Sequence, residues 1–176
     1  MPKKSRKQIN IDENRVIQEL LKNSSYSIDK LAKICGFSRQ KVWLIKKRLE
    51  KNKTIWGYHA IIDNEKLNVN RYIMLVKLRH LPIDNGIEKK MVDMTIDKLG
   101  ADLGVAVKDS IWVHGKYDFI VSFFAQNLIK AKNFQENFMS MYNGNISELQ
   151  LLENICTIEK DGFMNPRVVK TKKLLL

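Results

Sequence analysis

Hydrophobic residues in the N-terminal part of the chain recur three and four positions apart, a spacing that predicts three short helices. One side of the first helix carries Val16, Ile17, Leu20 and Leu21. Asp12 is expected to cap this helix, and Ser27 and Ser38 are expected to cap the second and third helices. The second helix is expected over Ile28–Cys35. The three helices therefore share one hydrophobic face and form one small subdomain.

The turn between the second and third predicted helices is the most informative part of the sequence. Gly36 tolerates the positive φ that a tight turn commonly needs, and the small side chain of Ala32 lets two helices cross closely. The positions that face inward are Leu31, Cys35, Phe37, Val42 and Ile45. This arrangement is typical of a helix-turn-helix, whose second helix enters the major groove of DNA.

The third predicted helix carries the side chains that such a motif needs. Its outward positions are Arg39, Gln40, Lys41, Leu44, Lys47 and Arg48. Arg39, Gln40 and Lys41 lie in the first turn, from which a recognition helix usually contacts base edges. Arg favours guanine, Gln favours adenine, and Lys can bind guanine or phosphate. Phosphate contacts are expected from Ser38, Lys46, Lys47 and Arg48.

Two large hydrophobic residues of this helix, Trp43 and Leu44, fall on or near its outward side. Trp43 can contact thymine methyl groups or pack on the following segment, and we expect it to pack, because aromatic residues at a helix edge usually belong to a core. For Leu44 two alternatives stay open. It can contact thymine methyl groups in the major groove, or it can pack on the segment that follows the helix.

The excess of positive charge is concentrated in the same part of the chain. Residues 1–60 contain 15 Lys and Arg against 5 Asp and Glu, a net +10, whereas residues 61–176 contain 16 against 14, a net +2. A localised excess is expected of a phosphate-binding surface, although solvated helix faces remain the alternative. The basic residues 1–8 are expected to be a flexible arm, which either lies along DNA or is an ordinary frayed terminus.

Beyond residue 54 the pattern changes from helical to alternating. Ile55–Ile62 alternates like a strand and is expected to connect two domains. Further strands are expected over 72–80, 110–114, 118–125 and 146–158, and helices over 87–99 and 128–142. This β-α-β-β-α-β order predicts an α+β fold of the ferredoxin-like type, with both helices on one face of an antiparallel sheet. Its core is expected to include Phe134, Phe138, Met139 and Met141.

Other classes of function find little support in the sequence. His59, His80 and His114 are scattered, and no Gly-rich phosphate loop, Cys pair or paired carboxylates are evident. We therefore predict no catalytic residue, no metal site and no cofactor. Cys35 and Cys156 lie in hydrophobic patterns, which favours a reduced, cytoplasmic setting over a disulfide framework. Neither a membrane-spanning stretch nor a secretory signal is expected.

Several short segments together resemble the Lrp/AsnC (feast/famine) transcription regulators over about residues 9–160. The matching segments, in chain order, are Ile11-Asp12, Leu31-Ala32, Gly36-Phe37-Ser38, Arg48-Leu49-Glu50, Ile55-Trp56-Gly57-Tyr58 and Gly115-Lys116-Tyr117-Asp118. The resemblance implies dimers that pair through the sheets of the second domain and often assemble further, to tetramers or octamers. It also implies small effectors, such as amino acids, that bind between dimers.

The resemblance and the charge pattern together suggest how the chain is divided. The expected parts are a basic arm (1–8), a helix-turn-helix domain (9–54), a linker strand and connector (55–70), a ferredoxin-like effector-binding and oligomerisation domain (71–160) and a basic tail (161–176). A dimer would place two recognition helices in successive major grooves of a pseudo-palindromic duplex. The predicted partners are therefore double-stranded DNA, further copies of the chain and a small effector, with no membrane.

The segment formed by Gly115, Lys116, Tyr117 and Asp118 is the expected effector-binding loop. The family usually has an acid where Lys116 stands. An acid there can hold the ammonium of an amino acid, whereas a lysine repels it. The departure favours an anionic effector or none, and a plain turn between two strands is the other interpretation of the loop. Lys53 also stands where a glycine commonly follows the third helix.

Two other functions fit the same domain plan. An architectural protein that compacts DNA with low specificity would use the same parts, and only the ratio of specific to non-specific affinity separates it from a site-specific regulator. The sirohaem decarboxylases resemble these regulators but have lost DNA binding. An enzyme of that kind would not need Arg39, Gln40 and Lys41 or the +10 charge of residues 1–60.

Overall fold

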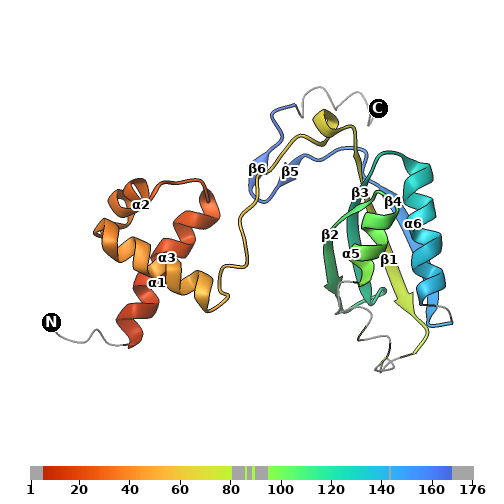
Figure 1. Cartoon of the computed structure of the whole chain (residues 1–176), viewed down its shortest axis with the longest axis horizontal. Helices are drawn as coiled ribbons and strands as arrows, with labels where there is room; N and C mark the ends of the chain where they lie inside the picture. Colours follow the sequence, from red (N-terminus) through yellow and green to blue (C-terminus); the bar gives the residue numbers. More distant parts are fainter. Residues whose placement is uncertain (1–5, 81–85, 87–88, 90–94, 143, 168–176) are drawn as a thin grey trace. The chain divides into compact units, whose positions relative to one another are not determined.

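The structure is a computed structural model that describes residues 6–80, 86, 89, 95–142 and 144–167. It divides into two compact units, Met1–Ile61 and Ile62–Leu176, which are described separately below (Figure 1). None of the helices in these described ranges has the length and hydrophobicity that a membrane span requires.

The first unit contains the three helices that the sequence predicts. These are α1 (Arg6–Lys22), α2 (Ile28–Cys35) and α3 (Arg39–Lys51). Their shared core consists of Val16, Leu20, Leu31, Ala32, Cys35, Val42, Ile45 and Leu49. The side chains of Ser27 and Ser38 cap α2 and α3, each at 3.2 Å from a backbone nitrogen of the first turn. Gly36 has φ +64°, so the predicted turn conformation is confirmed.

The start of the first helix differs from the sequence-based prediction. α1 begins at Arg6, and residues 6–8, expected in the flexible arm, are helical; residues 1–5 lie outside the described residues. Asp12 therefore lies inside the helix and is only 6% exposed. The prediction that Asp12 caps the helix is wrong, because its carboxylate pairs with Lys41 in α3 instead.

The linker between the units is not a strand within this chain. Ile55 packs against the core of the first unit, and the Tyr58 hydroxyl donates a hydrogen bond to Glu50 at 2.9 Å. Residues 55–63 form no strand although their sequence alternates, and the described strands pair only with one another. Trp56 is 93% exposed. A short 3₁₀ helix, η1 (Asn64–Leu67), follows.

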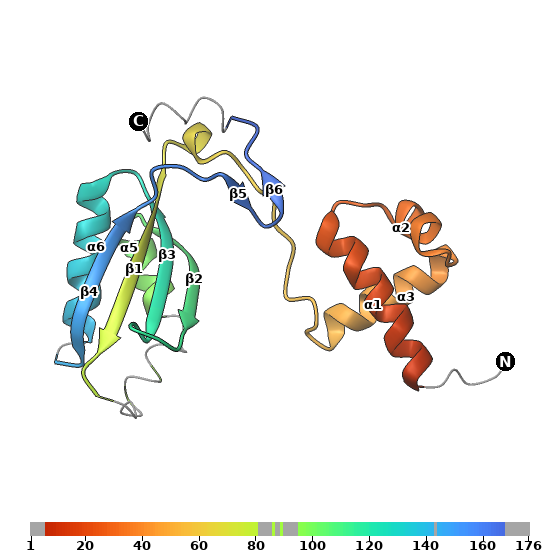
Figure 2. The same ribbon diagram turned by 180° about the vertical axis from the view of Figure 1, so that it is seen from behind.

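The second unit has the predicted ferredoxin-like order. Its strands are β1 (Asn70–Leu78), β2 (Ala106–Trp112), β3 (Phe119–Ala125) and β4 (Ile146–Glu153), and its helices are α5 (Thr95–Asp102) and α6 (Leu128–Met141). The strands form an antiparallel sheet in the order β2-β3-β1-β4. Both helices lie on the same side of this sheet (Figures 1 and 2). Of the helix expected over 87–99, the structure describes Lys89, which is helical, and the residues from Thr95 onward; the others lie outside the described residues.

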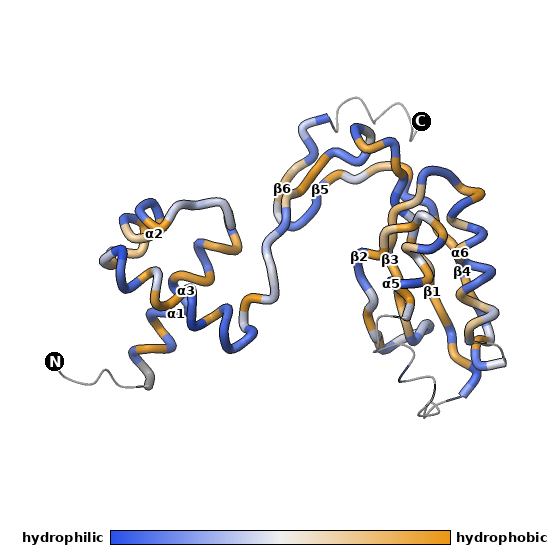
Figure 3. Tube along the Cα trace, in the orientation of Figure 1, coloured by the Kyte–Doolittle hydropathy of each residue, from blue (hydrophilic) through white to orange (hydrophobic). Residues whose placement is uncertain are grey.

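The core of this unit lies between the sheet and its helices. Alternate residues of β1 are buried, and β3 is almost entirely buried. Figure 3 shows hydrophobic residues along both strands. The fully buried side chains include Tyr72, Met74, Phe119, Phe123, Phe134 and Phe138. Met139, predicted to lie in this core, is instead 44% exposed, because it falls on the outer face of α6. Met141 packs against the core as expected.

The chain after β4 forms a hairpin that the sequence analysis missed. β4 ends at Glu153, earlier than predicted, and β5 (Glu159–Lys160) pairs with β6 (Phe163–Met164). Asp161 and Gly162 form the turn with φ of +50° and +80°. Two positive φ values mark a type I′ turn, for which Asp-Gly is a strong signal. The expected boundary between domain and tail, at residue 160, falls within this hairpin.

Candidate nucleic-acid interface

The helix α3 separates its hydrophobic anchors from its outward residues. Val42, Ile45 and Leu49 are buried in the core of the first unit. On the opposite side lie Gln40, Trp43, Leu44 and Lys47, spaced at i, i+3, i+4 and i+7, and all four are exposed. We call these four residues the α3 stripe. Trp43, predicted to pack, is 46% exposed, so that prediction is wrong, and Leu44 is 53% exposed.

A buried ion pair fixes the start of α3 against α1. The Nζ of Lys41 lies 2.8 Å from the carboxylate of Asp12, whose side chain is only 8% exposed. The same ammonium lies 3.3 Å from the centre of the Phe37 ring. Lys41 therefore faces its own domain, in contrast to the outward position that the sequence suggested. The sequence gives no direct sign of this pair, because Asp12 and Lys41 are brought together only by helix packing.

The other basic residues of α3 lie at its flanks in exposed contacts. The guanidinium of Arg39 is 2.6 Å from Asp29, and Arg48 pairs with Glu13. The ammonium of Lys46 lies 4.5 Å from the centre of the Tyr58 ring. Because exposed ion pairs contribute little to stability, these cations can exchange their partners for phosphate at low cost.

One tyrosine beside this helix has a strongly shifted pKa. Burial, together with the hydrogen bond to Glu50, raises the pKa of Tyr58 to about 12. A tyrosine with its ordinary pKa of 10 is already neutral at physiological pH, so the hydroxyl donates to Glu50 in either case.

The predicted effector loop is held by its last residue. One carboxylate oxygen of Asp118 accepts a hydrogen bond from the Leu78 backbone N–H, and the other accepts one from Lys77, both at 2.9 Å. Burial acts to raise the pKa of Asp118, but these two donors outweigh it, so the pKa is lowered. Gly115 has φ +149°, a conformation that favours glycine. Asp118 thus anchors the loop to the end of β1.

The middle of the loop is exposed and faces β4. The Tyr117 hydroxyl lies 3.1 Å from a carboxylate oxygen of Glu148 and 2.9 Å from the side-chain oxygen of Gln150. The ammonium of Lys116 lies 3.8 Å from Glu148. The hydrogen bond with Tyr117 and the charge of Glu148 raise the pKa of Lys116. Lys116 therefore places a cation where the family that this sequence resembles usually has an acid.

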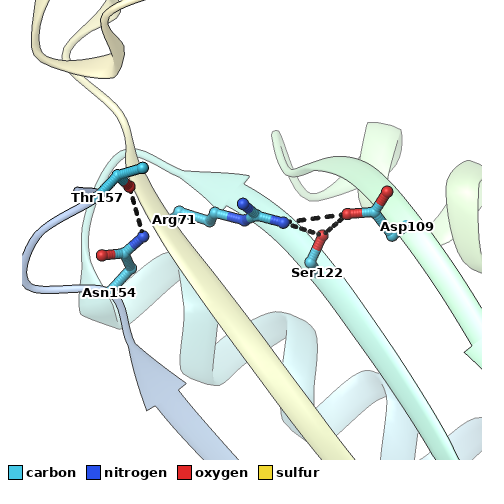
Figure 4. Close-up of polar contacts among 5 residues, drawn as sticks. All are labelled: Arg71, Asp109, Ser122, Asn154 and Thr157. Atoms are coloured by element: carbon cyan, nitrogen blue, oxygen red, sulfur yellow. Dashed lines mark hydrogen bonds and ion pairs between the residues drawn. The ribbon is translucent and has the colours of Figure 1, made fainter. Parts of the chain in front are cut away.

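The sheet of the second unit has a second face, turned away from α5 and α6, which we call the open face. Its partly exposed hydrophobic residues, matched by strand register, are Ile73, Leu75, Ile111, Ile120 and Leu152. At one end of this face, Arg71 reaches from β1 to Asp109 at 3.1 Å and to Ser122 at 3.2 Å (Figure 4). Ser122 also donates a hydrogen bond to Asp109.

The segment after β4 is fastened to β1 beside this group. The backbone N–H of Asn154 donates to the carbonyl of Arg71 at 2.9 Å. The side-chain amide of Asn154 donates to the Thr157 hydroxyl, also at 2.9 Å (Figure 4). These bonds fix the direction in which the chain leaves the sheet.

No family model matches this sequence, and no curated protein is similar enough to match it. Solved structures do match. PH0061 is 20% identical, with a TM-score of 0.67, and the match covers 91% of this chain and 98% of that one. An AsnC family transcriptional regulator from Agrobacterium tumefaciens is 14% identical, with a TM-score of 0.65, covering 90% of this chain and 97% of that one. The chain has the fold of the Lrp/AsnC regulators.

A third solved structure adds a ligand to this Lrp/AsnC comparison. The transcriptional regulator NMB0573 from Neisseria meningitidis, in complex with L-Met, is 15% identical, with a TM-score of 0.64. The match covers 85% of this chain and 91% of that one. The Lrp/AsnC resemblance inferred from short sequence segments is thus confirmed at the level of the fold.

Proposed function

We propose that this protein is a sequence-specific DNA-binding transcription regulator of the Lrp/AsnC type. The observation that carries the proposal is the outward side of α3, the second helix of the helix-turn-helix, which presents exposed polar, hydrophobic and basic side chains. The net charge of +10 over residues 1–60 supports it, because DNA binding draws much of its affinity from phosphate contacts.

The residues divide into three roles in this proposal. Arg39 and Gln40 contact base edges from the first turn of α3. Lys46, Lys47 and Arg48 contact phosphates, together with Ser38 at the helix start, where backbone N–H groups favour an anion. Leu44 lies among the base-contacting residues. For Lys41 we propose a positioning role in place of the base contact expected from the sequence, a role supported by its ion pair with Asp12.

The second unit serves self-association in this proposal. The open face carries five partly exposed hydrophobic residues, and a second copy of the same sheet would remove them from water. A dimer, or a higher oligomer built from dimers, presents two copies of α3 to a pseudo-palindromic duplex. Leu75→Lys, in the middle of this face, should give monomers in sedimentation velocity. Ile129→Lys is the control, on the exposed side of α6. Dimers of the Leu75 variant would contradict this surface.

A small effector is the remaining part of the proposal. One similar regulator binds L-Met. Here Asp118 is buried and holds the loop, so Lys116 is the exposed charge that the loop offers, and it selects a carboxylate. Amino acids and dicarboxylates should therefore be screened for a change in DNA affinity. Lys116→Glu should abolish the response to a carboxylate ligand while leaving DNA binding without ligand unchanged. A response that persists in this variant would contradict the assignment.

A competition titration tests the DNA-binding proposal. The labelled duplex is the DNA upstream of the protein's own gene, at about 0.15 M salt, because affinities depend strongly on salt. Unrelated duplex is added in excess. An affinity for the labelled duplex that is about 10³-fold higher than the affinity for the competitor supports a site-specific regulator. Equal loss to every competitor favours the architectural alternative, and failure to bind any duplex at low salt would contradict DNA binding.

A further inference from the structure

Two of the four residues in the α3 stripe are large and hydrophobic. Trp43 and Leu44 are 46% and 53% exposed, although they lie on a helix whose buried face is already complete with Val42, Ile45 and Leu49. Neither belongs to the core of the first unit. Adjacent exposed hydrophobic side chains within a polar surface mark a site of contact with a partner.

The surroundings of these two residues indicate what kind of partner it is. The ammonium of Lys47 lies 4.5 Å from the centre of the Trp43 ring, so a positive charge sits directly on the hydrophobic surface. Arg39 and Arg48 flank the stripe on the same helix. A hydrophobic protein surface would not be complementary to this many cations. A polyanion that also displays hydrophobic groups would be complementary to both the cations and the hydrophobic side chains.

Duplex DNA has one hydrophobic group in its major groove, the C5-methyl of thymine. A side-chain amide, such as that of Gln40, pairs best with adenine, the base opposite thymine. Gln40 and Leu44 are one helical turn apart, and Trp43 lies beside both on the same side of α3. Three neighbouring side chains of the stripe are therefore all suited to A·T base pairs.

We infer that Trp43 and Leu44 are specificity-determining residues that contact thymine methyl groups in the major groove. The inference rests on the proposed DNA-binding function and names the base feature that this site recognises. Lys47, held over the Trp43 ring, then lies at the edge of the contact, where it can bind the adjacent phosphate.

Replacement of thymine by deoxyuridine isolates this contact. Uracil pairs with adenine as thymine does but lacks the methyl group, so the duplex loses only the hydrophobic feature. The probe is the tightest-binding duplex selected from a random pool by the full-length protein. For the wild-type chain, each contacted methyl that is removed should weaken binding about fourfold.

Matched variants assign the effect to the two residues. Trp43→Ala and Leu44→Ala should bind the thymine duplex more weakly than wild type, and the double variant should bind thymine and uracil duplexes equally. Leu21→Ala is the control, because Leu21 is 69% exposed on α1 of the same unit. This control variant should keep the full response to uracil. Since all three side chains are exposed, the thermal unfolding of the variants should change little.

Four results would overturn the inference. If the wild-type protein bound thymine and uracil duplexes equally well, the methyl contact would be wrong while DNA binding still held. If the double variant remained sensitive to uracil, other residues would make the contact. If the substitutions instead changed the oligomeric state and left DNA affinity unchanged, the stripe would be a protein interface. If the random pool contained no duplex that the protein binds, the proposed function itself would fail.

Discussion

Each of the two units buries one aspartate against one lysine, but the two pairs are built differently. In the first unit Asp12 meets Lys41 at 2.8 Å, and in the second unit Asp118 meets Lys77 at 2.9 Å. The first pair joins two helices through side chains. The second also engages the backbone, because Asp118 accepts a hydrogen bond from the N–H of Leu78. The first pair fixes a helix start, and the second fixes a loop.

The comparison shows how the same chemistry serves two purposes. The pair in the first unit holds one lysine inward and leaves the α3 stripe free to contact a partner. In the second unit Asp118, the only acid of the loop 115–118, is held in the pair with Lys77. The exposed charge of this loop is therefore that of Lys116. A buried charge is costly to leave without its partner, and each unit should therefore respond to the loss of its own pair.

The largest effect is expected from Asp118→Ala. The substitution leaves the Leu78 N–H without its acceptor and removes the partner of Lys77, so the second unit should lose about 2–3 kcal/mol of unfolding free energy. The unfolding of this unit can be measured by urea denaturation, with the fluorescence of Trp112 as the signal. Trp43 and Trp56 are changed to Phe in the background used for this measurement. An unchanged midpoint would show that the loop does not depend on Asp118.

The same pair should make the second unit sensitive to acid. Because the pKa of Asp118 is lowered in the folded state, its contribution is fully present above its ordinary value of 3.8. It is lost as the pH falls from that value towards the lowered pKa. Denaturation curves between pH 6 and pH 3 should therefore show a steeper loss in wild type than in Asp118→Asn.

Lys41→Met should have a somewhat smaller effect, and on the first unit. The substitution keeps the hydrophobic stem but removes the ammonium that neutralises the buried Asp12 carboxylate, which should cost about 2 kcal/mol of unfolding free energy. Sequence preference among duplexes should stay unchanged, because Lys41 faces the domain itself. A relaxed preference with unchanged stability would instead make Lys41 a base-contacting residue.

Gln40→Ala and Lys47→Ala should separate base recognition from phosphate binding. Loss of a bidentate base contact at Gln40 should reduce discrimination between duplexes by about 1–3 kcal/mol. Loss of one phosphate contact at Lys47 should weaken binding to all duplexes similarly. It should also reduce the steepness with which log affinity falls against log salt by about 1. Identical behaviour of the two variants would remove the distinction between their roles.

The smallest effect is expected from Lys53→Gly, just after α3. Lys53 has φ +61°, a conformation that is unfavourable for a residue with a side chain. Glycine should relieve this strain and stabilise the first unit by about 0.5–1 kcal/mol, as measured by thermal unfolding. Asn52→Gly is a useful control, since Asn52 has φ −86° and should gain nothing.

Local patterns predicted much of this fold from the sequence alone. The range of α2, the caps at Ser27 and Ser38 and the turn at Gly36 depend on neighbouring residues and were found from them. The order of strands and helices in the second unit follows from hydrophobic periodicity in the same way. The Asp161-Gly162 turn is equally local, because the Asp-Gly pair itself favours a hairpin turn, although the alternating pattern alone does not mark it.

Features that depend on contacts between distant residues were not predicted. The role of Asp12 follows from its proximity to Lys41, which only the packing of α1 on α3 produces. The linker alternates like a strand, but a strand also needs hydrogen bonds to a partner strand, and the described strands pair only with one another. The exposure of Trp43 was readable in principle, because its spacing from Gln40 and Lys47 places it outside the buried positions of α3.

In the proposed function, two copies of α3 read a specific duplex while the second units hold the copies together. The decisive experiment is selection from a random pool of duplexes by the full-length protein, at about 0.15 M salt. We expect an enriched pseudo-palindrome whose half-sites are about one helical turn apart, roughly 10 base pairs. Recovered duplexes that share no sequence, or no recovery of DNA at all, would contradict it.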